Sequence, residues 1–354
     1  MTMMAEVKNM ILGNKSSLTV AAGLARGLTD FAVSRGASRT ELLARAGIAA
    51  ADLADQDNRI AFENYVALMR AAKTLTGDPA LALHYGEAND MAEVSVVGLI
   101  ANASETMFEA FHQLSRFGRL VIEFDGGPDR FHSVQEDGGL WAVDSRQNAN
   151  GFPELTESTF ARMVCGPRSF GVTQIAKRVC VTHPAPAYRD EYDRIFGVPV
   201  TFEAKWNALQ IDEQWMFHRV QLQPRYVFGV LSARADVLLK ELENSKTVRG
   251  KVESLLMPVL HKGDAGMDAI AEKMAVSRQT LFRRLKEEDT TFEKILDELR
   301  HRLALDYLGA KKVSVNEAAY LVGFSDPAAF SRAFKRWTGA SPRAFRAGNH
   351  PAQS

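Results

Sequence analysis

Hydrophobic residues recur every three or four positions from about Leu18 to Leu120, which is the period of amphipathic helices packed on a core. Asp78 followed by Pro79 predicts the start of one helix, with the aspartate as N-cap and the proline in the first helical position. From about Val121 the period changes to two, the period of half-buried strands. The pattern therefore places helices first and strands after them.

The clearest strand signal is a hairpin. Residues 130–135 and 140–144 alternate in polarity on either side of the turn sequence Glu-Asp-Gly-Gly at 136–139. Further strands are predicted at 178–182, 198–202 and 207–212, and a short helix at 188–196. Because helices and strands are segregated along the chain, we expect an α+β domain here.

Charge divides the chain where the next helix ends. A helix is predicted at 226–242, and the polar stretch 244–247 follows it. Residues 1–245 carry 24 Lys and Arg against 30 Asp and Glu, a net charge of −6, whereas residues 246–354 carry 19 against 13, a net charge of +6. A basic region beside an acidic one favours a polyanionic partner for the basic part. We therefore expect two domains, 1–243 and 244–354, the second of them all-α.

The basic domain begins with a helix-turn-helix pattern at about 267–288. A short helix at 268–274 and a turn at Ala275 and Val276 precede a second helix that Ser277 caps. In that second helix Leu281 and Leu285 are spaced to face the core. The residues predicted to face outward, and to contact DNA, are Arg278, Gln279, Phe282 and Arg283.

A second copy of the pattern lies at about 314–337. Ser314 and Glu317 form a capping box, and Asp326 followed by Pro327 starts the second helix. Phe330 and Phe334 are spaced to face the core of that helix. The residues predicted to face DNA are Ser331, Arg332 and Lys335.

A periodic helix over about 292–307 joins the two units and would hold them at a fixed separation. An α-helix fits the major groove, and successive grooves on one face of DNA lie about 34 Å apart. Two such units therefore predict binding to double-stranded DNA. Because Pro327, Ala328 and Ala329 leave the tip of the second helix without polar side chains, we expect base reading to depend mainly on the first unit, with Arg332 the chief reader in the second.

These residues also carry a family resemblance. The stretch 319–342, with Gly-Phe, Phe-Ser-Arg-x-Phe-Lys, Gly339 and Pro342, closely resembles the signature of the AraC/XylS transcription regulators, and 277–285 is similar to their first recognition helix. The resemblance implies a seven-helix DNA-binding domain on a bent duplex that usually activates transcription near RNA polymerase. Asp289 departs from the family pattern, which often has glycine there, so we expect a differently capped or frayed helix end.

The N-terminal domain resembles one branch of that family, whose α/β domain is labelled arabinose-binding without implying arabinose as its ligand. The similar segments are 57–60, 76–83 and 192–202. The branch implies a domain that senses a small molecule or mediates dimerisation.

We therefore expect a homodimeric transcription regulator that binds double-stranded DNA at specific sequences and responds to a small effector. We expect it to be an activator rather than a repressor and to contact RNA polymerase. One alternative is a regulator without an effector, whose N-terminal domain only dimerises or binds protein. A remote alternative is an enzyme fused to a DNA-binding domain, but we find no nucleotide-binding, hydrolase or zinc-protease motif and expect neither enzyme activity nor a cofactor or metal. Two cysteines and the lack of an export signal or a long apolar run indicate a cytoplasmic protein without a membrane span.

Overall fold

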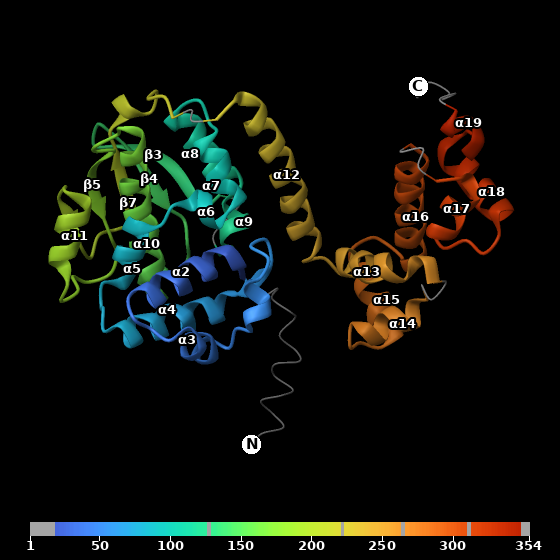
Figure 1. The fold of residues 1–354 in the computed structure, drawn as a ribbon, viewed down its shortest axis with the longest axis horizontal. Helices are drawn as coiled ribbons and strands as arrows, with labels where there is room; N and C mark the ends of the chain where they lie inside the picture. The colour runs from blue at the N-terminus through green and yellow to red at the C-terminus, as the bar shows by residue number, and fades with distance from the viewer. Residues whose placement is uncertain (1–17, 126–128, 221–222, 263–265, 310–312, 348–354) are drawn as a thin grey trace, which may run out of the picture. The chain divides into compact units, whose positions relative to one another are not determined.

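The computed structural model describes residues 18–125, 129–220, 223–262, 266–309 and 313–347. The chain divides into two compact units, one up to Leu239 and one from Lys240 (Figure 1). The boundary lies within α12, Arg225–Asn244, the helix that was predicted at 226–242. Each unit is described by itself.

The first part of the N-terminal unit is mainly helical, as predicted. Its helices are α2 (Ala22–Ser34), α3 (Arg39–Ala46), α4 (Phe62–Thr76), α5 (Leu81–Ala88), α6 (Met91–Val94), α7 (Val96–Asn102), α8 (Met107–Arg116) and α9 (Gly118–Val121), with a 3-10 turn at Ala50–Leu53. The helical pattern did not show two short strands, β1 (Thr19–Ala21) and β2 (Arg59–Ala61), which pair antiparallel and place β1 beside α4.

The predicted helix start at Asp78 and Pro79 was wrong by two positions, because α5 begins at Leu81. The Asp78 carboxylate accepts a hydrogen bond from the Ala80 amide at 3.0 Å, and the Asp78 carbonyl oxygen accepts one from the Leu81 amide at 3.3 Å. Aspartate therefore closes a turn before the helix rather than capping the helix itself.

The predicted hairpin and strands form one five-stranded sheet with the order β3-β4-β7-β5-β6. Its strands are β3 (Phe131–Glu136), β4 (Gly139–Asp144), β5 (Ala176–Cys180), β6 (Val200–Thr201) and β7 (Ala208–Ile211). The pairings are antiparallel except that of β5 with β6. Asp137 and Gly138 turn the hairpin with φ of 52° and 68°, the left-handed values of a type I′ turn.

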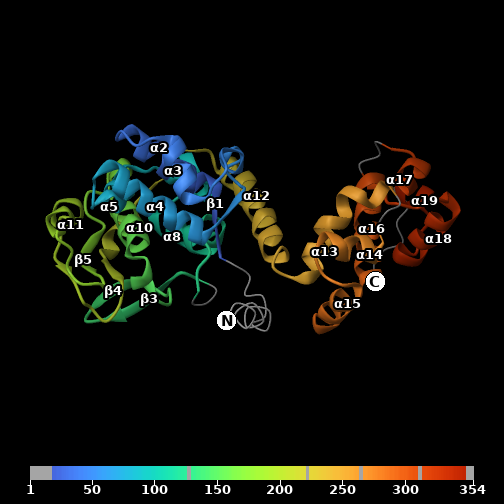
Figure 2. The ribbon, with the colours of Figure 1, turned by 90° about the horizontal axis from the view of Figure 1, so that it is seen from below.

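Two further helices, α10 (Pro153–Cys165) and α11 (Arg189–Phe196), pack on this sheet and bury Phe160, Tyr192 and Phe196. α10 also lies beside α5, so the helices of the first part and the sheet share one unit (Figure 2). The N-terminal unit is thus the expected α+β fold. Among the described residues, no helix combines the length and the apolarity needed to cross a membrane.

The described part of the C-terminal unit after α12 is all-helical. Its elements are α13 (Val248–Leu256), a 3-10 segment (Met257–Lys262), α14 (Met267–Lys273), α15 (Arg278–Glu287), α16 (Phe292–Gly309), α17 (Val315–Leu321), α18 (Pro327–Thr338) and α19 (Pro342–Arg346). The described residues therefore contain, after α12, the seven α-helices that the family resemblance implied.

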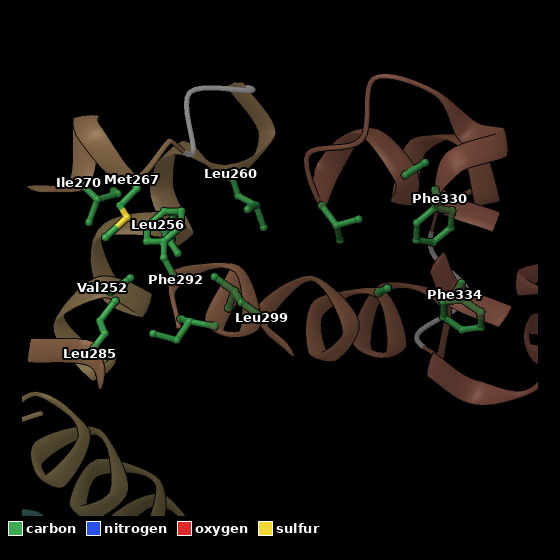
Figure 3. Packing of buried hydrophobic residues seen from close by; sticks show 14 of the residues in the cluster. Val252, Leu256, Leu260, Met267, Ile270, Leu285, Phe292, Leu299, Phe330 and Phe334 are labelled. Carbon is green, nitrogen blue, oxygen red and sulfur yellow. The ribbon is translucent and has the colours of Figure 1, made fainter. Parts of the chain in front are cut away.

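One hydrophobic cluster runs through this unit. Figure 3 shows Met267, Ile270 and Leu285 at one end of it, Leu299 of α16 in the middle, and Phe330 and Phe334 at the other end. α16 contributes to the cluster along its length, so it joins the two helix-turn-helix units in one core, with α14 and α15 beside α13, and with α17 and α18 beside α16.

Candidate nucleic-acid interface

The first helix-turn-helix unit consists of α14, a turn and α15. The Ser277 hydroxyl oxygen accepts a hydrogen bond from the Thr280 amide at 3.1 Å and so caps α15 as predicted. Ala271 is buried at the crossing of α14 with α15, and Leu281 and Leu285 are fully buried. These contacts fix which side of α15 faces solvent.

The predicted reading residues of α15 lie together on its solvent-facing side. Arg278, Phe282 and Arg283 are 61%, 58% and 72% exposed, and Gln279 is exposed as well. Arg278 pairs with Asp268 of α14 at 2.7 Å between Nη1 and Oδ2, whereas Arg283 reaches Glu287 only at 3.8 Å. Pairs this exposed contribute little free energy, so both guanidinium groups can exchange their carboxylate for a phosphate or a base edge.

The end of α15 keeps its capping geometry although glycine is missing. Asp289 has a φ of 52°, and the amides of Asp289 and Thr290 donate to the carbonyl oxygens of Lys286 and Leu285, each at 3.1 Å. This is the hydrogen-bond pattern of a Schellman motif, in which Asp289 occupies the left-handed position. The expected fraying is therefore not present, and an aspartate holds the conformation that glycine adopts more readily.

The second unit begins with the predicted capping box. The Ser314 hydroxyl accepts from the Glu317 amide at 3.1 Å, and the Glu317 carboxylate accepts from the Ser314 amide at 2.6 Å. These backbone and side-chain hydrogen bonds hold the pKa of Glu317 below its usual value. Ala319 is fully buried, as Ala271 is in the first unit.

The second reading helix, α18, is capped by Asp326, whose carboxylate accepts from the amides of Ala328 at 2.9 Å and Ala329 at 3.0 Å. Those two hydrogen bonds lower the pKa of Asp326. Phe330 and Phe334 are fully buried as predicted. The N-terminal tip of α18 is thus set by a cap and an aromatic core and carries alanine side chains toward solvent.

The three residues predicted to face DNA from α18 differ in availability. Arg332 is 73% exposed and lies 3.8 Å from Asp326, and Lys335 is exposed. Ser331 is half-buried, and its hydroxyl donates to the Pro327 carbonyl oxygen at 2.9 Å. Its proton is therefore engaged within the helix, whereas the two long cationic side chains reach into solvent.

Two residues of α16 that the sequence did not single out position the second unit. Arg300 donates from Nε to the Val322 carbonyl oxygen at 3.1 Å and from Nη2 to the Gly323 carbonyl oxygen at 2.9 Å. Asp297 accepts from the Trp337 indole at 2.8 Å and from Arg336 at 2.9 Å. Burial lowers the pKa of Arg300. In the sequence both residues look like ordinary solvent-facing charges of a helix, so spacing offered no signal for these roles.

The helix between the units sets the scale of the surface. α16 has 18 residues, which at about 1.5 Å per residue spans about 27 Å, comparable with the ~34 Å between successive major grooves. The unit also carries the excess of basic residues, +6 over 246–354. Two capped helices with exposed cationic faces, joined through α16 in one core, carry the charge that contact with DNA phosphates requires.

This architecture defines a DNA-binding protein of the transcription-regulator class. A family model described as "Helix-turn-helix domain" matches residues 270–348. A second, described as "Arabinose-binding domain of AraC transcription regulator, N-term", matches residues 36–220, more than half of the chain. The chain belongs to the AraC family of transcription regulators.

Several known proteins are similar over different lengths. The ornithine utilization regulator of Pseudomonas aeruginosa is 27% identical over 338 residues, which cover 94% of this chain and 98% of the relative. The HTH-type transcriptional activator RhaS of Escherichia coli is 36% identical over 121 residues, 34% of this chain and 43% of RhaS. The crystal structure of the transcriptional regulator CdpR from P. aeruginosa aligns over 91% of this chain and 97% of its own, with 20% identity and a TM-score of 0.39.

Proposed function

We propose that this regulator is a sequence-specific activator that binds DNA as a homodimer and responds to a small effector. In this proposal residues 1–243 form the domain that senses the effector or mediates dimerisation, and residues 244–354 form the DNA-binding domain. The observation that carries it is the pair of capped reading helices that share one core with α16 and expose their cationic faces. The relatives, which include an activator in RhaS and a regulator of ornithine utilization, support a regulatory rather than an enzymatic role.

The roles of the seven interface residues follow from their environments. We assign base reading to Arg278, Gln279, Phe282 and Arg283 of α15 and to Arg332 of α18 because these side chains are exposed. Lys335 is assigned to a phosphate, since an ammonium is a compact charge without the planar fork of arginine. The half-buried Ser331 is assigned to a phosphate, to which its hydroxyl would donate in place of the Pro327 carbonyl oxygen that it bonds here.

Dimerisation and contact with RNA polymerase, which the family resemblance implies, belong to the same proposal, as does the cytoplasmic location inferred from the sequence. The alternative is a regulator without an effector. A cavity of about 780 Å³ in the N-terminal unit, within the range of metabolite sites, supports the effector-responsive form.

Base reading by α15 is tested with Arg283→Ala. The full chain is used to select its preferred duplex from a random-sequence pool, and fluorescence anisotropy measures binding to that duplex and to random DNA. We expect Arg283→Ala to cost about 1–3 kcal/mol on the selected duplex and to relax discrimination at one base pair. Arg302→Ala is the matched control. Arg302 is also exposed and forms an ion pair, with Glu253 of α13 at 3.0 Å, but it lies on α16 and not on a reading helix. Equal losses on selected and random DNA would show that Arg283 does not read a base.

A further inference from the structure

The cavity of the N-terminal unit runs along one side of α4. Its opposite walls are residues 123–125, which follow α9, and residues 146–152, which follow β4. Its apolar lining includes Phe62 and Val66 of α4 together with Phe124 and Phe152. At about 780 Å³ it can hold a metabolite of ordinary size.

Two charged residues of the lining, Glu123 and Arg146, are almost entirely buried, and Arg146 is the cation of the two. The Arg146 side chain is 7% exposed, its Nε donates to Asp144 Oδ2 at 2.9 Å, and its Nη2 donates to the Thr156 hydroxyl. Among the contacts of the residues described, Nη1 makes no hydrogen bond. Arg146 is therefore held in place by two neighbours and retains donors at the cavity wall.

The charge around Arg146 is unbalanced. Asp144, whose side chain is completely buried, also accepts a charge-assisted hydrogen bond from Arg130 at 3.0 Å, so two guanidinium groups share one carboxylate. Burial, and next the charge of Arg130, lower the pKa of Arg146 to about 10, which leaves it protonated at neutral pH. A buried cation without its own counter-charge is costly, and an anion in the cavity would compensate it.

The acidic residues of the lining do not supply that counter-charge. The Glu123 carboxylate accepts from the Thr19 amide at 3.1 Å and from the Thr19 hydroxyl at 2.8 Å, and the charge of Arg59 acts on it. Glu63 and Asp125 are exposed at the mouth of the cavity, where water screens them. Arg146 is thus a buried cation of the lining that shares its carboxylate with Arg130 and lies in the same cavity as the apolar side chains.

We propose that this cavity binds a small organic monocarboxylate with an apolar body, the carboxylate at Nη1 of Arg146 and the body against Phe62, Val66 and the two phenylalanine rings. This inference rests on the proposal that the N-terminal unit binds an effector, and it names the chemical class. An N⁺–H···O⁻ hydrogen bond to a nearly buried guanidinium gives both affinity and orientation.

The test uses the full chain and calorimetric titration with 4-phenylbutyrate and hexanoate as probes, and their amides as neutral controls of the same shape. We expect both carboxylates to bind and the amides to bind at least tenfold more weakly. Arg146→Lys keeps a charge beside Asp144 but loses the guanidinium fork, so carboxylate affinity should fall at least tenfold while amide affinity stays the same. Ala67→Trp, which fills the cavity from α4, should abolish binding, whereas Ala51→Trp, at an exposed site outside the lining, should not.

Three results would overturn the inference: no binding of either carboxylate at millimolar concentration, equal affinity for carboxylates and amides, or undiminished binding to Ala67→Trp. Anisotropy with the selected duplex, measured on the same preparations without probe, separates this outcome from the proposed function. If DNA binding is intact and any of the three results is found, only the cavity proposal is refuted. If the wild type prefers no duplex over random DNA, the proposal of sequence-specific regulation is refuted. The calorimetric evidence for carboxylate binding in the cavity is then unaffected.

Discussion

The turns of the two helix-turn-helix units each contain one residue in the left-handed conformation, an alanine in the first turn and a glycine in the second. Ala275 has a φ of 53°, and Gly323, 48 positions later, has a φ of 79°. In each turn the next amide donates to the carbonyl oxygen of the buried alanine, Val276 to Ala271 at 3.0 Å and Phe324 to Ala319 at 2.9 Å. A left-handed conformation costs an L-residue with a Cβ about 1–2 kcal/mol, so the first turn is strained where the second is not.

Ala275→Gly should therefore stabilise the C-terminal unit. Removing the Cβ relieves about 1–2 kcal/mol of strain in the left-handed conformation. Glycine also increases the conformational entropy of the unfolded chain, which offsets about 0.4–1 kcal/mol of that gain. The expected net gain is about 0.5–1 kcal/mol in the free energy of unfolding.

The reverse change, Gly323→Ala, should destabilise the unit by more than the first change stabilises it. A Cβ at Gly323 would lie 2.4 Å from the carbonyl oxygen of Leu260, a backbone atom that cannot rotate away. The clash adds about 1–3 kcal/mol to the cost of the left-handed conformation, for a net loss of about 2–4 kcal/mol.

Both variants are measured in the full chain by urea titration with pulse-labelling hydrogen exchange. Peptides from α15 and α16 then report the C-terminal unit separately from the N-terminal one, which matters because a two-unit chain need not unfold in one step. If Ala275→Gly left the midpoint unchanged or lowered it, the left-handed conformation of Ala275 would be wrong. If Gly323→Ala cost less than about 1 kcal/mol, the close approach of Leu260 would be wrong.

Three further predictions concern charge. Lys335→Ala should lower the slope of log affinity against log salt by about one unit if its ammonium contacts a phosphate, and an unchanged slope in anisotropy titrations would rule out that contact. Because the pKa of Asp326 is lowered in the folded unit, its capping stabilisation is present above pH about 4 and lost as pH falls through the folded pKa. In Asp326→Asn the urea midpoint of pulse-labelled α18 peptides should therefore fall less as the pH is lowered than it does in the wild type. The same pH dependence in both proteins would contradict this. Burial raises the pKa of Glu157 despite hydrogen bonds from Tyr188 and Tyr192, so the N-terminal unit should lose stability as pH rises above the ordinary range of glutamate. Glu157→Gln should raise the urea midpoint of α10 peptides more at pH 8 than at pH 4, and a gain independent of pH would refute the assignment.

The DNA-binding unit was predictable because its signals are local. Ser277, the Ser314–Glu317 box and Asp326 each cap a helix within three residues of their own position, as the structure confirms. The buried phenylalanines and leucines likewise follow from helical spacing within one element. The helix start at Asp78 failed for the same local reason: an aspartate can close a turn as readily as it caps a helix.

The sequence alone determined where the helices of the two helix-turn-helix units begin and which of their faces are buried, since caps and periodicity act over three or four residues. It did not indicate α13 or α19. Only the tertiary structure decided which charges hold the units together and which remain available. Asp297 and Arg300 are fixed by partners more than twenty positions away, and Arg146 lies at a cavity formed by segments from residue 18 to residue 152. Such pairings depend on chain segments distant in sequence meeting in space, and no local pattern records them.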